Sequence, residues 1–157
     1  MRRFQVKFVL TALLLVLTPV VPAVFAQNSQ AHPAYANALS DLRYARALLD
    51  FGTYHDVSPM TAKAIEQIDI ALKEIKEASM DDGKSLNDHP PVDSSRKPNQ
   101  RFQDALAALN RAHTDVAGAE ADPKAKGLRV EALHQIDAAR VHTKEAYDRT
   151  LAEDPKH

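Results

Sequence analysis

One stretch of fifteen residues occurs twice in this chain, and it constrains the fold more than any other feature. Residues 64–78 read AIEQIDIALKEIKEA and residues 132–146 read ALHQIDAARVHTKEA, with eight of the fifteen positions identical at an offset of 68. Each copy carries a mostly apolar stripe at helical spacing, formed by Ile65, Ile68, Leu72 and Ile75 in the first and by Leu133, Ile136, Ala139 and Thr143 in the second. A duplicated amphipathic helix predicts a duplicated structural unit rather than a reaction.

Each copy is expected to form the second helix of a helical hairpin. A first helix precedes each copy, and residues 38–49 and 105–116 share their apolar pattern at an offset of 67. Proline is well tolerated in the first turn of a helix, and it opens three of the four predicted helices, at Pro33, at Ser58-Pro59 and at Asp122-Pro123. The predicted hairpins therefore span residues 32–80 and 101–152.

The segment between the hairpins, residues 81–100, is predicted to be a long irregular loop. It contains Pro90, Pro91 and Pro98, one glycine and several Asp, Asn and Ser residues, which disfavour helix and strand. Two hairpins that lack partners for their apolar stripes pair most simply into a four-helix bundle. We therefore predict an all-α fold over residues 32–157, an up-down-up-down four-helix bundle made of two similar αα-hairpins.

The N-terminus reads as a secretory signal peptide covering residues 1–26. Arg2, Arg3 and Lys7 form a positive region, an apolar run follows, and Val24-Phe25-Ala26 offers small residues for cleavage after Ala26. An uncleaved anchor is the alternative, but Pro19 and Pro22 interrupt the run, and a spanning helix needs roughly 20 apolar residues. We expect a periplasmic or secreted protein with no membrane span after cleavage, and a disordered lead-in at residues 27–31.

Composition narrows the classes of function. The full chain has a net charge of −1, and signal cleavage removes three positive charges, so the protein lacks the basic surface of a nucleic-acid binder. It has no cysteine, which excludes thiol nucleophiles, cysteine-ligated clusters and disulfides. No serine-hydrolase, metalloprotease or phosphate-loop motif occurs. We therefore expect no catalytic residues and no enzyme activity.

Several segments carry a resemblance that spans the chain from its first helix to its last. They are HPAYANALSDLRYAR (residues 32–46), DDGKSLNDHPPVD (81–93), GLR (127–129) and QIDAAR (135–140). With these segments the chain resembles a group of small exported bacterial helical-bundle proteins of unknown function. The resemblance implies one small exported domain and no particular activity.

The irregular loop is the first place to look for a binding site. In an up-down-up-down bundle it would meet the start of the first helix and the end of the fourth at one pole. That pole would gather the imidazole and carboxylate groups of His89, Asp88, Asp82, His32 and His142. Such donors suit a divalent metal such as zinc or copper. The alternative is that these residues cap helices and stabilise turns, because no two of them have ligand spacing on one helix.

Asp69 and Asp137 occupy the same position in the two copies. Paired carboxylates ligate two metals in ferritin-like bundles, but those sites also need a Glu-x-x-His pair on each of two helices. Only Glu131 and His134 provide one here. Ion pairing is the favoured interpretation, with Asp69 bound to Lys73, Arg43 or Arg46 and Asp137 bound to Arg140.

No cofactor is expected, apart from the divalent metal just considered. A b-type haem held by Met80 and His142 is disfavoured because the Leu, Ile and Ala stripes leave no obvious cavity. The sequence thus predicts an exported, non-enzymatic binding or interaction module whose ligand is a protein or a small molecule. A metal-binding protein using the loop pole is the alternative, and a structural or stress-related envelope protein is the third reading. The sequence leaves the oligomeric state open.

Overall fold

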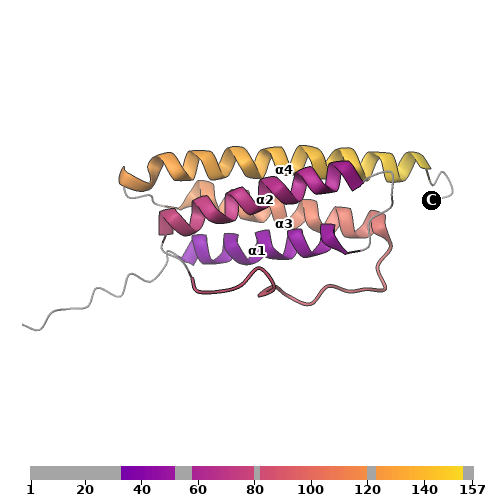
Figure 1. Ribbon diagram of the computed structural model, residues 1–157, viewed down its shortest axis with the longest axis horizontal. Helices are drawn as coiled ribbons and strands as arrows, with labels where there is room; N and C mark the ends of the chain where they lie inside the picture. The colour runs from indigo at the N-terminus through magenta and orange to yellow at the C-terminus, as the bar shows by residue number, and fades with distance from the viewer. Residues whose placement is uncertain (1–32, 52–57, 80–81, 120–122, 154–157) are drawn as a thin grey trace, which may run out of the picture.

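The structure is a computed structural model that describes residues 33–51, 58–79, 82–119 and 123–153. Within these residues all regular secondary structure is helical, and there is no strand. Four helices pack against one another (Figure 1): α1 (Pro33–Asp50), α2 (Ser58–Ser79), α3 (Pro98–Gly118) and α4 (Lys126–Glu153), with a short 3-10 helix, η1 (Pro123–Ala125), before α4. The predicted signal peptide and lead-in, together with His32, lie outside the described residues.

Pro33 opens the first helix as predicted, whereas Pro123 opens the short 3-10 helix η1, and α4 begins only at Lys126 instead of at the predicted Asp122-Pro123. Pro33 and Pro98 open α1 and α3, where a missing amide hydrogen costs no helical hydrogen bond. The amide of Lys97 donates to Gln100 Oε1 at 3.1 Å, so a side chain in the first turn of α3 satisfies one of the free donors at the helix start. The Thr61 hydroxyl donates to the Ser58 carbonyl at 2.9 Å at the start of α2.

The four helices form a closed ring of neighbours. In the described part of the chain, α1 packs on α2 and α3, α4 packs on the same two helices, and the diagonal pairs make no close contact. The two largest interfaces join α1 with α3 and α2 with α4. These are the helices that the sequence repeat makes equivalent, so each helix packs chiefly on its own counterpart.

The direction of α3 corrects the predicted up-down-up-down order. Arg111 of α3 holds Asp41 of α1 in a two-pronged ion pair, at 2.7 and 3.1 Å, while Arg101 lies 5.0 Å from the ring of Phe51. Residue numbers therefore rise along α1 as they fall along α3, and the two helices are antiparallel neighbours. The order is up-down-down-up, because the segment between α2 and α3 travels along the bundle before α3 begins (Figure 1).

Equivalent helices of the two hairpins run antiparallel, the arrangement expected of an approximate two-fold axis perpendicular to the bundle. The contact of Arg46 with Asp69 in the first hairpin has its counterpart in the contact of His113 with Asp137 in the second. Antiparallel packing of equivalent helices is what such an axis produces. In the core, Ile68 and its repeat partner Ile136 are both fully buried, whereas Ile65 and Leu133, the first members of the predicted stripes, are only partly buried against it.

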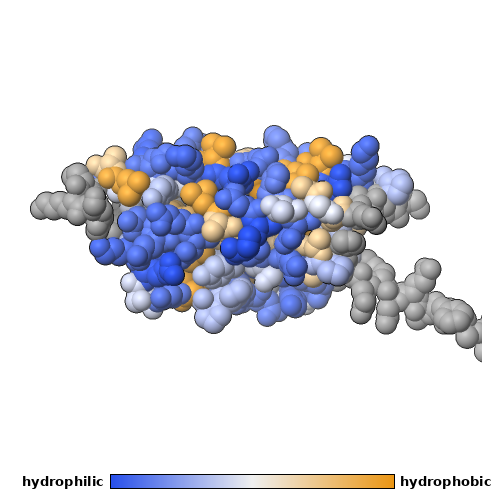
Figure 2. Space-filling view, turned by 180° about the vertical axis from the view of Figure 1, so that it is seen from behind, coloured by the Kyte–Doolittle hydropathy of each residue, from blue (hydrophilic) through white to orange (hydrophobic). Residues whose placement is uncertain are grey.

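No described helix is both long enough and apolar enough to pass through a bilayer. The face opposite to that of Figure 1 is mostly hydrophilic, and its apolar residues form small separate groups rather than one broad patch (Figure 2). On α4, Val130 and Val141 are each 56% exposed. Exposed apolar residues of this kind are ordinary on a protein surface.

Candidate functional site

Residues 82–97, here called the crossover segment, run along the outside of α1 (Figure 1). This segment is the part of the chain that the repeat does not duplicate, and it has no regular secondary structure. Its passage over α1 buries side chains that would otherwise face solvent. Arg43 is the largest example, since its side chain is only 1% exposed.

The start of the crossover segment is fixed by an ion pair. Arg43 Nη2 donates to Asp82 Oδ1 at 2.7 Å, and Asp82 is itself 11% exposed. Lys76 Nζ lies 3.8 Å from the same carboxylate and donates to the Lys84 carbonyl at 3.1 Å. Gly83 adopts a φ of 69°, a left-handed conformation that glycine adopts without strain. The chain therefore reverses sharply after α2 and is held where it turns.

These contacts favour the ionised form of the Asp82 carboxyl group. Burial pushes the pKa of its carboxyl up, but hydrogen bonds from Arg43 and from the Lys84 amide, with the charges of Arg43 and Lys76, outweigh burial and lower the pKa below its usual 3.8. Asp82 is thus a carboxylate at neutral pH, and the buried Arg43 has a charged partner.

The far end of the crossover segment is held by a second ion pair. Arg96 Nη1 lies 2.7 Å from Asp104 Oδ2 on α3, and Val92 packs against the hydrophobic core. Between the two ends, the hydrogen bonds that the structure gives to residues 85–95 stay within the segment, as in the bond from the Asp88 amide to the Ser85 carbonyl at 3.1 Å. The middle of the segment therefore rests on α1 by side-chain packing.

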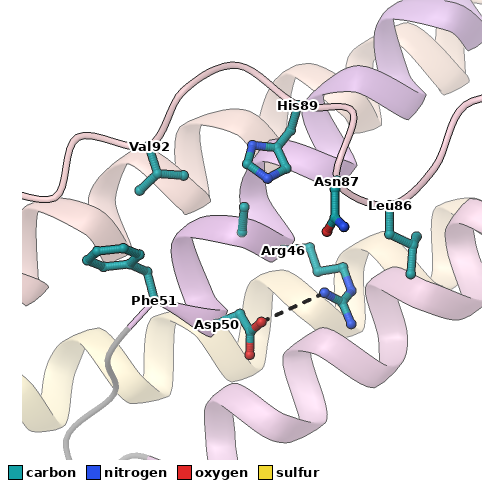
Figure 3. A pocket seen from close by; sticks show the side chains of 8 residues that line it. Arg46, Asp50, Phe51, Leu86, Asn87, His89 and Val92 are labelled. Carbon is teal, nitrogen blue, oxygen red and sulfur yellow. Dashed lines mark ion pairs between the residues drawn. The ribbon is translucent and has the colours of Figure 1, made fainter.

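A hollow of about 310 Å³ lies between the middle of the crossover segment and the C-terminal half of α1 (Figure 3). Phe51 and Val92 lie at one end of it, Arg46, Asn87 and Leu86 at the other, and His89 projects from the segment above α1. Its remaining lining residues are Ala47 and Asp50. Phe51 and Leu86 are both 42% exposed, so two of the large exposed apolar side chains of the described chain line the same hollow, at opposite ends.

The polar groups of the hollow are only partly engaged by the protein. Arg46 Nε donates to Asp69 at 2.8 Å, whereas Arg46 Nη1 is 4.0 Å from Asp50 Oδ2. His89 Nδ1 lies 2.8 Å from the Pro90 carbonyl. A carbonyl oxygen only accepts, so Nδ1 carries the hydrogen and Nε2 of the neutral ring is left as an acceptor. The hollow thus combines apolar walls with a cation, a carboxylate and an imidazole.

The structure does not gather the residues predicted for a metal site. Asp82 is bound to Arg43, and Asp88 is exposed on the outside of the crossover segment. His142 lies on α4, diagonally across the bundle from α1, with its Nδ1 3.2 Å from Glu145 Oε2. His32 lies outside the described residues. Over the residues that the structure describes, no group of three or more His, Asp or Glu side chains is close enough to hold a metal ion.

The helix directions explain why the predicted pole is absent. That pole required α3 to begin where α2 ends, and the crossover segment instead carries the chain along α1 before α3 starts. Of the members of the proposed set that the structure describes, only His89 lines the hollow that the segment forms. The hollow contains residues that the metal hypothesis did not consider, notably Arg46, Asp50 and Phe51.

The ion-pair interpretation of the repeated aspartates is confirmed. Asp69 accepts a hydrogen bond from Arg46 across the first hairpin, at 2.8 Å. Asp137 accepts one from Arg140 Nη1 at 2.7 Å, and His113 Nε2 lies 3.6 Å from the same oxygen. Each repeated aspartate is therefore ion-paired with an arginine.

No protein-family model, curated protein or solved structure matches this chain. The function therefore has to be inferred from the hollow and from the segment that builds it.

Proposed function

We propose that the protein is an exported, non-enzymatic helical-bundle binding module, and that the hollow beneath the crossover segment is its ligand site. The N-terminal sequence pattern supports export, as does the resemblance to small exported bacterial proteins. The hollow supports binding, because exposed Phe51 and Leu86 line it together with Arg46, Asn87 and His89. Ligand sites typically combine apolar walls with a few converging polar groups.

Size and placement favour a small molecule over a protein partner. Ligand pockets span roughly 300–1,000 Å³, and the hollow, at about 310 Å³, lies at the lower end of that range. Stable protein–protein interfaces bury roughly 1,200–2,000 Å² with an apolar centre. Figure 2 shows no broad apolar patch of that kind on the opposite face of the bundle. The hollow is also lined by the crossover segment, which the repeat does not duplicate, whereas the duplicated helices pack chiefly against each other.

A fluorescent amphipathic anion, anilinonaphthalene sulfonate (ANS), tests the site in purified protein. We expect a saturable fluorescence increase. Leu86→Asp should weaken ANS binding about tenfold, since loss of one leucine contact is worth about 1–2 kcal/mol. Val141→Asp is the matched control, because Val141 is 56% exposed and lies on α4, outside the hollow. Equal effects of the two substitutions, or no saturable binding, would remove the hollow as a ligand site.

Metal binding is the second candidate, and one observation favours it. His89 Nδ1 is committed to the Pro90 carbonyl, and metal-bound histidines commonly donate their second ring N–H to such a carbonyl. Asp50 lines the same hollow. Calorimetric titration with Zn²⁺ tests this: His89→Ala should abolish binding, while His134→Ala on α4 should not. Identical titrations for both variants would dismiss a site at His89.

A further inference from the structure

The charged residues of the hollow, Arg46 and Asp50, are placed unfavourably for helix stability in two respects. Asp50 is the last residue of α1, where the negative end of the helix dipole disfavours a carboxylate. Its i,i+4 partner Arg46 precedes it, and an arginine placed before an aspartate is the less favourable orientation of such a pair. Asp50 is 70% exposed and 4.0 Å from Arg46, so the pair is loose. Side chains that break local rules without stabilising the fold are commonly functional.

The hydrogen bond from Arg46 to Asp69 fixes the orientation of the Arg46 guanidinium group. Its Nε donates to Asp69 at 2.8 Å, which holds the guanidinium plane and leaves the terminal nitrogens on the side of Asp50. Figure 3 shows the two charged groups facing each other in the hollow. A ligand with one charge would meet one attractive group and one repulsive group there. A ligand with both charges would meet two attractive groups.

From this juxtaposition we infer that the hollow binds a small zwitterion with an apolar side chain, the class of free apolar α-amino acids. The ligand carboxylate faces Arg46, the ammonium group faces Asp50, and the side chain lies toward the end lined by Phe51 and Val92. Ala47, at the α1 side of the hollow, leaves the space that a larger residue would fill. This inference rests on the proposed function, since it names the ligand class of the same site.

Calorimetric titration of the full chain with L-leucine tests the inference. Isocaproate, which lacks the ammonium group, and isopentylamine, which lacks the carboxylate, are the matched probes. We expect L-leucine to bind at least tenfold more tightly than either. Equal or tighter binding of isocaproate would show that the ammonium group is not recognised, and would overturn the inference.

The substitution Asp50→Asn separates recognition from folding. Removing a carboxylate from the end of α1 should leave helix content and melting temperature unchanged or slightly raised. It should weaken L-leucine binding at least fivefold without weakening isocaproate binding. Asp148→Asn on α4, which removes an exposed carboxylate paired with Lys144, is the control and should leave both titrations unchanged. If Asp50→Asn weakens the binding of L-leucine and of isocaproate equally, Asp50 does not bind the ammonium group.

The proposed function and the ligand class fail in different ways. If ANS binds and Leu86→Asp weakens it while L-leucine does not bind, the hollow is a ligand site and the zwitterion inference is wrong. If neither ANS nor L-leucine binds, both are wrong.

Discussion

Neutralising Asp82 should destabilise the whole bundle, although this residue lies outside every helix. The substitution Asp82→Asn keeps the shape of the side chain and removes its charge, which leaves Arg43 buried at 1% exposure without a charged partner. Removing one partner of a buried ion pair costs about 3–5 kcal/mol. The asparagine oxygen still accepts a hydrogen bond, so we expect a loss of roughly 3 kcal/mol, at the lower end of that range. Urea unfolding followed by circular dichroism measures it.

Two further variants identify the cause of that loss. Asp148→Asn breaks an exposed ion pair with Lys144 and should cost less than about 1 kcal/mol. The double variant Arg43→Met/Asp82→Asn removes both charges, and it should recover much of the loss because methionine fills the space without a charge to solvate. If Asp82→Asn is as stable as Asp148→Asn, or if the double variant is less stable than Asp82→Asn alone, the buried ion pair does not hold the crossover segment.

The pH dependence of this difference has a defined sign. The pKa of Asp82 is lowered in the folded protein from its usual 3.8. Its contribution to stability is therefore complete above the unfolded pKa and is lost as the pH falls through the folded value. The gap between the original protein and Asp82→Asn should be constant from pH 7 to about pH 5 and should shrink below about pH 4. A gap that does not change down to pH 3 would mean that the Asp82 charge is not its source.

Two further predictions address the backbone and the helix order. Gly83→Ala should cost about 1–2 kcal/mol of stability because alanine is strained at a φ of 69°. Gly127→Ala in α4 should be neutral or stabilising by up to about 1 kcal/mol. Similar unfolding midpoints for the two variants would refute the left-handed turn at Gly83. The chain has no cysteine, so introduced cysteines can be crosslinked selectively. A short bifunctional maleimide should crosslink Phe51→Cys/Arg101→Cys, whose positions lie close together, and should not crosslink Ala34→Cys/Arg101→Cys. The reverse pattern would support the up-down-up-down order.

Much of the fold was predictable from local signals. Proline starts and the repeated stripe of Ile68 and Ile136 predicted four helices and their buried faces, because helix boundaries and amphipathic periodicity depend on neighbouring residues. The order of the helices was not predictable in this way. The direction of α3 depends on whether the linking segment turns back at once or travels along α1. Contacts far apart in sequence decide this, such as Arg111 with Asp41.

The candidate site, like the fold, was predictable from the sequence only where local signals determine it. The sequence singled out the unduplicated loop, and that segment does build the hollow. Arg43 and Arg46 lie off the apolar stripe of the first helix or at its edge, so periodicity gave no sign that Arg43 is the largest fully buried side chain among the described residues. Its ion-pair partner, Asp82 at the start of the crossover segment, lies 39 residues later in the chain. One local signal was available for the hollow: Asp50 places a carboxylate at the unfavourable end of a helix.

The most direct test is to map where a ligand binds, by recording amide resonances of ¹⁵N-labelled protein during titration with ANS. Binding beneath the crossover segment predicts that the largest shifts fall at Arg46, Ala47 and Phe51 on α1 and at Asn87 and His89 in the segment, with α4 around Val141 unaffected. Shifts centred on α4, or spread evenly over the bundle, would contradict a binding site between the crossover segment and α1.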